Sequence, residues 1–202
     1  MFFIGELLRD DVDILLNILR KNSNDHITQV GNMFFGSYYQ SFKFFTDHVE
    51  GVFDKFKFLR GNNDNPIFCV KSKHYLGNYG MNHEAGYFFV SGSCSDKTDR
   101  NRKIYIDQFP NEELTSHELE RMEDFYSKIK PDIVVTNEIP EIVKLRYDIP
   151  ISKTSLVLSD LISIHSPLYW IYGIDHKKDT EKFFEYGKTK FFGINKREVI
   201  GI

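Results

Sequence analysis

Leu59-Arg60-Gly61-Asn62-Asn63-Asp64-Asn65-Pro66 holds the strongest clue to the fold of this chain. The aromatic run from Phe53 to Phe58 precedes it and is typical of a buried strand, after which the chain turns on Gly, Asn, Asp and Pro. A loop at the carboxyl end of a buried strand is where α/β proteins place their binding and catalytic groups. We therefore expect functional residues to gather around this loop.

Strands and helices alternate in the first third of the chain. Apolar residues in short runs ended by glycine predict strands, and apolar residues at helical spacing predict helices. The predicted elements are a strand at 2–4, a helix at 11–21, a strand at 27–30, a helix at 38–49 and a strand at 56–59. This alternation predicts right-handed crossovers and a largely parallel sheet.

The rest of the chain predicts a second sheet with its own helices. Residues 67–75 and 85–91 are strand-like around a Gly77-Asn78-Tyr79-Gly80 turn, which indicates an antiparallel pair. Thr115-Ser116-His117-Glu118 is a capping-box pattern at the start of a helix. Further predictions are strands at 103–106, 132–136 and 168–172, a helix at 153–165, and two or three strands in the last thirty residues. Two face-to-face sheets with helices outside would hold all of these in one domain, residues 1–202.

Composition narrows the class of protein. The 202 residues are 41% hydrophobic and 27% charged with a formal net charge of −3, which gives no electrostatic case for nucleic acid or membrane as the main partner. Cys69 and Cys94 are predicted to be reduced thiols, with one disulfide as the alternative. The apolar run at residues 1–4 is too short for a signal or membrane segment, so we expect a cytoplasmic protein.

Four segments, in order along nearly the whole chain, resemble the calcineurin-like metallophosphoesterases, most closely the small bacterial and phage-type members. Residues 61–64 resemble Gly-Asn-His-Asp/Glu, and 89–96 with Arg100 resemble Gly-Ala-x-Ser-x-Asp…Arg. Residues 130–140 resemble Lys-Pro-Asp-Ile-Val-x-Thr/Ser-His-x-x-Pro, and 167–176 resemble Pro-x-x-Trp-x-x-Gly-His-x-His. The resemblance implies an α/β fold, a four-layer α/β/β/α sandwich of two mixed sheets with the site on loops at the strand ends.

At the family's metal-binding and catalytic positions the chain departs from the pattern. Glu6 and Leu8 replace the Asp and His of the family's Asp-x-His motif, and Asn32 and Phe35 replace the two aspartates of Gly-Asp-x-x-Asp. Asn62 and Asn63 stand at the family's Asn-His pair, where only the Asn is retained. Asn137 replaces the histidine of Thr/Ser-His, and in Gly-His-x-His the first histidine is Ile174 while the second is retained as His176. The remnant metal positions that keep a polar side chain are Glu6, Asn32, Asn62, Asn137 and His176. Asn63 replaces the histidine that protonates the leaving group in the family.

This donor set predicts that no metal cofactor is bound. Two divalent cations about 4 Å apart repel by roughly 15–20 kcal/mol at an effective dielectric near 20. A bridging carboxylate offsets that repulsion in the family, whereas Asn32 is neutral. Asn63 does not titrate near neutral pH and so cannot act as an acid. If any metal binds, we expect a single weakly held divalent ion such as Mn²⁺ at Glu6 and His176, although a carboxylate–imidazole contact is the favoured interpretation of that pair.

The predicted function is therefore that of a catalytically inactive pseudo-metallophosphoesterase that acts as a protein-binding or scaffold module. The alternative is a metal-dependent phosphoesterase with a weak or rebuilt single-metal site around Glu6, Asn62 and His176. The resemblance to phage-type members also implies a viral, host-directed role in the host cytoplasm. Scaffolds of this fold, such as the retromer subunit, provide the analogy for a protein partner.

Several side chains near the loops have two interpretations. Phe34, Phe35, Tyr38 and Tyr39 are candidate partner-binding residues if exposed, although burial in the vacated cleft is the favoured prediction. The asparagines could satisfy each other, or bind a small polar ligand. Asp64 is predicted to make a structural hydrogen bond, and Asp96 with Arg100 an ion pair. The remaining histidines lack ligand spacing and are predicted to lie on the surface or in loops: His26, His48, His74, His83, His117 and His165.

Overall fold

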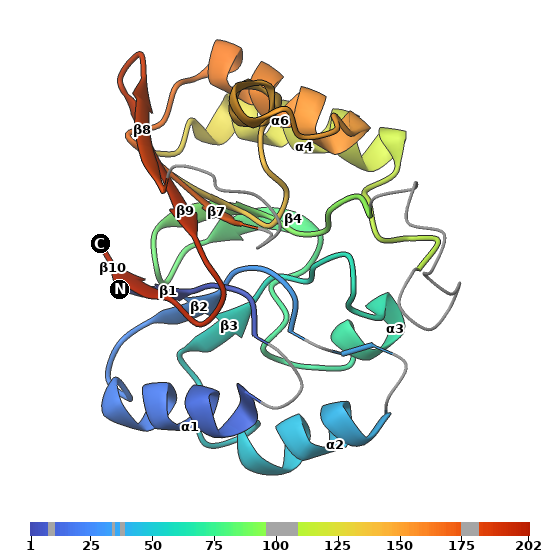
Figure 1. Cartoon of the computed structure of the whole chain (residues 1–202), viewed down its shortest axis with the longest axis vertical. Helices are drawn as coiled ribbons and strands as arrows, with labels where there is room; N and C mark the ends of the chain where they lie inside the picture. Colours follow the sequence, from blue (N-terminus) through green and yellow to red (C-terminus); the bar gives the residue numbers. More distant parts are fainter. Residues whose placement is uncertain (8–10, 34, 37–38, 96–108, 175–181) are drawn as a thin grey trace.

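A computed structural model describes residues 1–7, 11–33, 35–36, 39–95, 109–174 and 182–202, with the backbone alone at 39–41. Two sheets pack face to face in it, and helices cover their outer faces (Figure 1). The predicted α/β/β/α sandwich of two mixed sheets is confirmed.

The smaller sheet is built from the two ends of the chain. Its strands, in spatial order, are β10 (Val199–Gly201), β1 (Phe2–Ile4), β2 (Ile27–Gln29) and β3 (Phe56–Phe58). The first three strands of the chain are parallel, whereas the C-terminal β10 runs antiparallel to β1. Helices α1 (Val12–Lys21) and α2 (Tyr39–His48) lie below this sheet in Figure 1.

The larger sheet carries the second half of the chain. Its spatial order is β4 (Tyr79–Asn82), β5 (Tyr87–Val90), β6 (Ile133–Thr136), β7 (Tyr169–Gly173), β9 (Thr189–Ile194) and β8 (Phe183–Tyr186). The four inner strands are parallel, and both edge strands are antiparallel to their neighbours. Helices α4 (Ser116–Ile129) and α6 (Lys153–Ile164) lie above it in Figure 1.

Local sequence signals explain why the helices begin where they do. Thr115 accepts a hydrogen bond from the Glu118 backbone, and the Glu118 side chain bonds back to the Thr115 backbone, so the predicted capping box is formed. Ser152 and Ser155 form the same arrangement at the start of α6. The short α5 (Glu141–Lys144) and the 3₁₀ helix η2 (Leu145–Tyr147) lie between the predicted strand at 132–136 and the predicted helix at 153–165, where we predicted no element.

The prediction of a strand at 67–75 is wrong. The Asn65 side chain accepts a hydrogen bond from the Ile67 backbone N–H, and Pro66 occupies the first helical position, so α3 (Pro66–Cys69) begins there. The antiparallel partner of β5 is instead β4, which includes part of the predicted 77–80 turn. The predicted strand at 103–106 lies outside the described residues.

Three apolar clusters hold the layers together. One lies between the smaller sheet and its helices, one between the larger sheet and its helices, and one between the two sheets. Cys69 is buried and Cys94 half-buried, and the two do not form a disulfide. Within the described ranges, no helix combines the length and the apolar character needed to cross a membrane.

Phe35 and His74 both pack in the aromatic core beneath the smaller sheet. Phe35 is fully buried, with ring centroids 5.0 Å from Phe45, 5.3 Å from Phe58 and 5.5 Å from Phe42. It is therefore part of the core beneath the smaller sheet and not of an exposed binding patch. His74, predicted to lie on the surface or in a loop, lies in a turn, and its ring is fully buried because it packs against the same aromatic cluster.

Truncating Phe35 should destabilise the protein strongly. A Phe35→Ala variant should lose about 3–5 kcal/mol of unfolding free energy, because it empties the centre of this cluster. Phe44→Ala on α2 is the matched control, since Phe44 is 36% exposed. Urea unfolding followed by circular dichroism measures both, and equal losses would contradict the assignment of Phe35 to the core.

Candidate functional site

The loops that follow the parallel strands of the two sheets meet at one end of the molecule. A Cβ added to Gly173, at the end of β7, would lie 3.5 Å from the Cα of Gly31, which follows β2. The Asn62 side chain, after β3, donates to Ser95 Oγ, after β5, at 3.4 Å. The carboxyl ends of both sheets therefore share one edge, where the sequence predicted the site.

Asn32 joins the loops after β1, β2 and β3. Its Nδ2 donates to Glu6 Oε1 at 2.7 Å, and its Oδ1 accepts from the Asn63 backbone N–H at 2.8 Å. Its backbone carbonyl accepts from the Leu7 N–H at 3.1 Å and from Gln29 Nε2 at 3.0 Å. Both ends of the side-chain amide are thus engaged by protein groups.

Gly61, in the loop after β3, is required by the contact with Asn32. A Cβ added to Gly61 would lie 2.2 Å from Asn32 Oδ1, well inside van der Waals contact. Any larger residue at position 61 would push the Asn32 side chain away from the loop. Gly61 therefore allows the close approach of the Asn32 amide to the loop after β3.

Asp64 holds the same loops through their backbone. Its carboxylate is fully buried and accepts backbone N–H bonds from Met33 at 2.9 Å, Phe35 at 2.9 Å and Gly61 at 2.8 Å. Burial raises the pKa of Asp64 to about 6, while these backbone hydrogen bonds oppose the rise. The predicted structural role of Asp64 is confirmed: its carboxylate binds the backbone of the loop after β2 and of the loop after β3.

Glu112 holds the loop after β5, a role that no motif or spacing in the sequence indicated. Its carboxylate accepts from the Ser95 backbone N–H at 2.8 Å and from Ser95 Oγ. Its backbone carbonyl accepts from Arg60 Nη1 at 2.8 Å, and the Arg60 carbonyl accepts from the Gly92 N–H at 2.8 Å. These contacts tie the loop after β3 to the loop after β5.

Glu138 is a second buried carboxylate that sequence reasoning missed as a site residue. It pairs with Lys144 at 2.8 Å, and both side chains are 5% exposed. It also accepts from the Cys94 backbone N–H at 2.9 Å. The neighbouring Asn137 is buried, and its backbone N–H donates to the Val90 carbonyl at 3.1 Å. The sequence signal that could have indicated Glu138 is its position directly after Asn137, in the segment 130–140 that resembles a family motif.

The predicted site residues therefore fall into three groups. Glu6, Asn32 and Asn63 are brought into direct contact, while Asn62 and Asn137 lie on neighbouring loops. Ile174 is 3% exposed and belongs to the core of the larger sheet. Leu8, Phe34, Tyr38, Asp96, Arg100, His176 and the side chain of Tyr39 lie outside the described residues.

Metal-ligating side chains do not gather in the described ranges. No group of three or more His, Cys, Asp or Glu residues there is arranged to hold a metal ion. Among the residues at the predicted metal-binding positions that the structure describes, the side chains with an oxygen that could ligate a metal are the carboxylate of Glu6 and the amides of Asn32, Asn62 and Asn137. The predicted Glu6–His176 contact stays a prediction, and Glu6 accepts a hydrogen bond from Asn32.

Comparison with known proteins supports the fold. No protein-family model and no curated protein matches the sequence. Among solved structures, TT1561 of Thermus thermophilus is similar with a TM-score of 0.57 and 13% identity, covering 96% of this chain and 89% of that one. GAP50, described as the anchor in the inner membrane complex of Plasmodium, is similar with a TM-score of 0.56 and 11% identity, and the match covers 96% of this chain and 71% of GAP50. At these identities the likeness shows the fold alone, which is consistent with the calcineurin-like phosphoesterase type.

Replacing one carboxylate oxygen of Asp64 by an amide NH2 group should loosen these loops. Asp64→Asn should cost about 1–3 kcal/mol of unfolding free energy at pH 7.5, because an amide cannot accept all the backbone N–H bonds that the carboxylate accepts. Asp54→Asn is the matched control, since Asp54 forms an exposed ion pair with Lys73. Thermal unfolding compares the two variants, and a melting temperature for Asp64→Asn equal to that of the control would contradict the role of Asp64.

Proposed function

We propose that this chain is a catalytically inactive protein of the metallophosphoesterase-like fold that binds a partner protein. The observation that carries the proposal is the hydrogen bonding of Asn32. Its amide joins Glu6 to the Asn63 backbone, at the position where the resembling family has the carboxylate that lies between two metals. A carboxylate there would repel Glu6 unless a cation lay between them, whereas an amide bonds to Glu6 directly.

The electrostatics of the donor set do not fit a two-metal centre. Two divalent cations about 4 Å apart repel by roughly 15–20 kcal/mol at an effective dielectric near 20, and anionic ligands are needed to offset this. The amides of Asn32, Asn62 and Asn137 carry no charge. Hard divalent cations accept amide oxygens, but strong sites supply carboxylates. The Asn32 oxygen is in addition occupied by the Asn63 N–H.

The acid of the family reaction is also missing from its expected position. Asn63 stands where the resembling family has the histidine that protonates the leaving group. Its amide does not titrate near pH 7 and cannot deliver a proton. The loop keeps its shape through Gly61 and Asp64, and this supports a scaffold that has retained its fold without the family chemistry.

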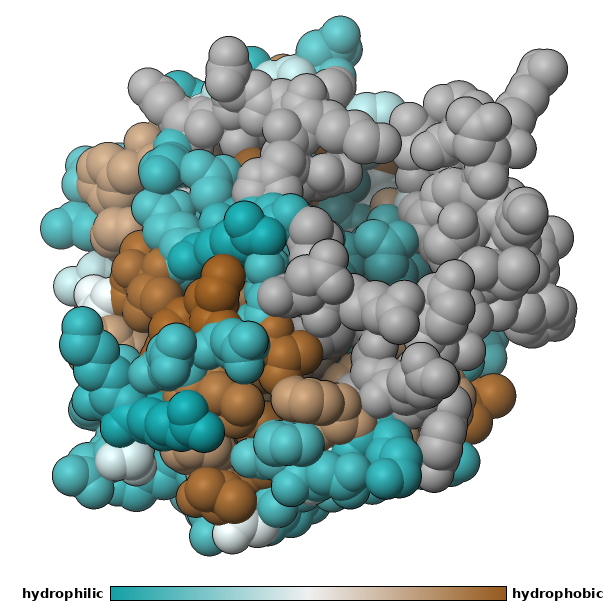
Figure 2. Space-filling view, turned by 60° about the horizontal axis from the view of Figure 1, so that its bottom comes forward, coloured by the Kyte–Doolittle hydropathy of each residue, from teal (hydrophilic) through white to brown (hydrophobic). Residues whose placement is uncertain are grey.

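A binding role is supported by apolar side chains next to the loop. Helix α3 begins at Pro66, two residues after Asp64; Ile67 in the helix is 65% exposed, and Val70 at its C-cap is 70% exposed. Figure 2 shows a face on which apolar side chains come to the surface between hydrophilic ones. The Plasmodium neighbour is described as an anchor, which provides an analogy of role for this fold. The viral origin and host-cytoplasmic location implied by the resemblance stay predictions.

Metal binding and hydrolysis test the inactive assignment. Purified protein should carry no stoichiometric transition metal and should not hydrolyse bis-p-nitrophenyl phosphate with Mn²⁺ added. Asn32→Asp should behave differently: it places a second carboxylate beside Glu6, so Mn²⁺ should raise its melting temperature but not that of the unmodified chain. Metal analysis, hydrolysis assays and thermal unfolding measure these outcomes. Turnover by the unmodified protein above a Glu6→Ala/His176→Ala control would contradict the proposal and favour the single-metal phosphoesterase.

A charged substitution on α3 tests the protein-binding part. Ile67→Asp/Val70→Asp should abolish recovery of a partner protein in affinity capture from the native host, since it puts charge into an apolar contact. Leu156→Asp is the control, because Leu156 is exposed on α6 of the other sheet. Mass spectrometry identifies proteins held by the unmodified chain and the control but not by the α3 variant. Identical captures from all three would exclude α3 as the binding surface.

A further inference from the structure

A groove of about 650 Å³ lies at the end of the molecule opposite the candidate site. Its wall includes His26, which directly precedes β2, and Lys55, which directly precedes β3. It also includes Glu84, from the turn between β4 and β5. These positions are at the amino ends of the parallel strands. The groove therefore shares no residue with the loops of the proposed scaffold site, and the inference drawn from it does not depend on that proposal.

Positive charge exceeds negative charge in the wall of this groove. Lys55, Lys57 and Lys73 contribute three ammonium groups, against the carboxylates of Asp54 and Glu84. This local excess contrasts with the formal net charge of −3 for the whole chain. A local cationic cluster on an acidic protein favours a small anion over a long polyanion such as nucleic acid.

The lysines keep donors available for such an anion. Lys73 pairs with Asp54 at 3.0 Å. By contrast, Lys55 Nζ donates to the Asn24 carbonyl at 2.7 Å, and Lys57 Nζ donates to the Lys73 carbonyl at 3.5 Å. A carbonyl takes one of the three ammonium hydrogens and does not neutralise the charge. Both ammonium groups can therefore donate to an anionic oxygen in the groove.

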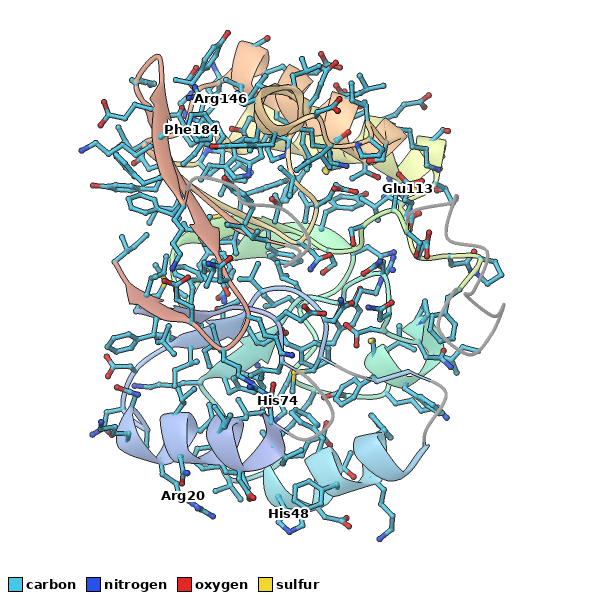
Figure 3. All side chains as sticks on the ribbon, in the orientation of Figure 1. Arg20, His48, His74, Glu113, Arg146 and Phe184 are labelled. Carbon is cyan, nitrogen blue, oxygen red and sulfur yellow. The ribbon has the colours of Figure 1, made fainter. Side chains whose placement is uncertain are left out.

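His74 adds a hydrogen-bond acceptor of defined tautomer. It belongs to the wall of the groove and is labelled in Figure 3. Its Nδ1 lies 2.7 Å from the Phe56 carbonyl oxygen, so Nδ1 must carry the hydrogen. Burial lowers the pKa of His74, which keeps the ring neutral and leaves a lone pair on Nε2. Nε2 is buried and has no hydrogen-bond partner among the described residues, which is uncommon in folded proteins.

We propose that this groove binds hydrogen phosphate. The ammonium groups of Lys55 and Lys57 hold its anionic oxygens, and His74 Nε2 accepts a hydrogen bond from its protonated oxygen. A metal ion fits the same wall less well: His26, Asp54, His74 and Glu84 include the right side-chain types, but no three such residues in the described ranges are arranged to hold one.

The neutral imidazole gives the proposal a sharp ligand test. Phosphate carries a P–O–H group at pH 7, whereas sulfate has the same shape and no proton to give to Nε2. Isothermal titration of the full chain at low salt should show saturable binding of inorganic phosphate, with sulfate about tenfold weaker for the loss of one hydrogen bond to the anion. Equal binding of the two ions would overturn the proposal, as would the absence of saturable phosphate binding.

Matched lysine variants test the place of binding. Lys57→Gln should weaken phosphate binding about tenfold, because it removes a charged donor from the groove. Lys188→Gln changes net charge equally in the exposed turn between β8 and β9 and should leave the affinity unchanged. Equal weakening by both variants would mean a general effect of net charge and would overturn the site. Amide NMR shifts at Lys57 and Lys73 on adding phosphate give a second readout, and their absence during binding would likewise exclude the groove.

Discussion

The neutral amide of Asn32 lies at the end of the molecule where the loops converge. It donates to Glu6 and accepts from the Asn63 backbone, so one side chain joins the loops after three parallel strands. A carboxylate at that place would bring two negative charges together and would call for a cation to hold them. The arrangement of the loops and the charge of the site therefore both depend on the neutral side chain of Asn32.

The buried carboxylates of this region serve the backbone. Asp64 accepts N–H bonds from the loops after β2 and β3, and Glu112 accepts from the loop after β5. Glu138 does the same for Cys94 while paired with Lys144. Hydrogen bonds or an ion pair offset part of the cost of burying each charge, and at Asp64, whose pKa is raised to about 6, burial outweighs them. These hydrogen bonds connect the loops through protein groups alone.

The two ends of the sandwich differ in charge and in the kind of ligand they suit. At the carboxyl ends of the strands, Glu6 lies among uncharged amides. At the amino ends, the groove beside His74 gathers lysines and an imidazole acceptor. In α/β proteins the carboxyl ends are the usual ligand site, so an anion groove at the opposite end would be a property of this chain and not of its fold.

Much of the fold could be predicted because its signals are local. The capping box at Thr115 and Glu118 placed the start of α4, since it needs residues only three apart in sequence. The strand predicted at 67–75 failed because Asn65 and Pro66 begin a helix there, a local signal that the apolar run concealed. For the site, the asparagine positions were readable from the sequence, but the bracing role of Glu112 was not, because no nearby residue reveals its contact with Ser95.

The sequence by itself determined most of the alternation of strands and helices, the sandwich class, and the presence of asparagines where the resembling family has metal ligands. Tertiary structure decided what these side chains contact: Asn32 bonds to Glu6, 26 residues away, and Phe35 packs against Phe45 and Phe58 in the core. Contacts between residues far apart in the chain depend on how the sheets bring their loops together. Composition and spacing do not indicate which distant residues come into contact, so only the folded structure could show these contacts.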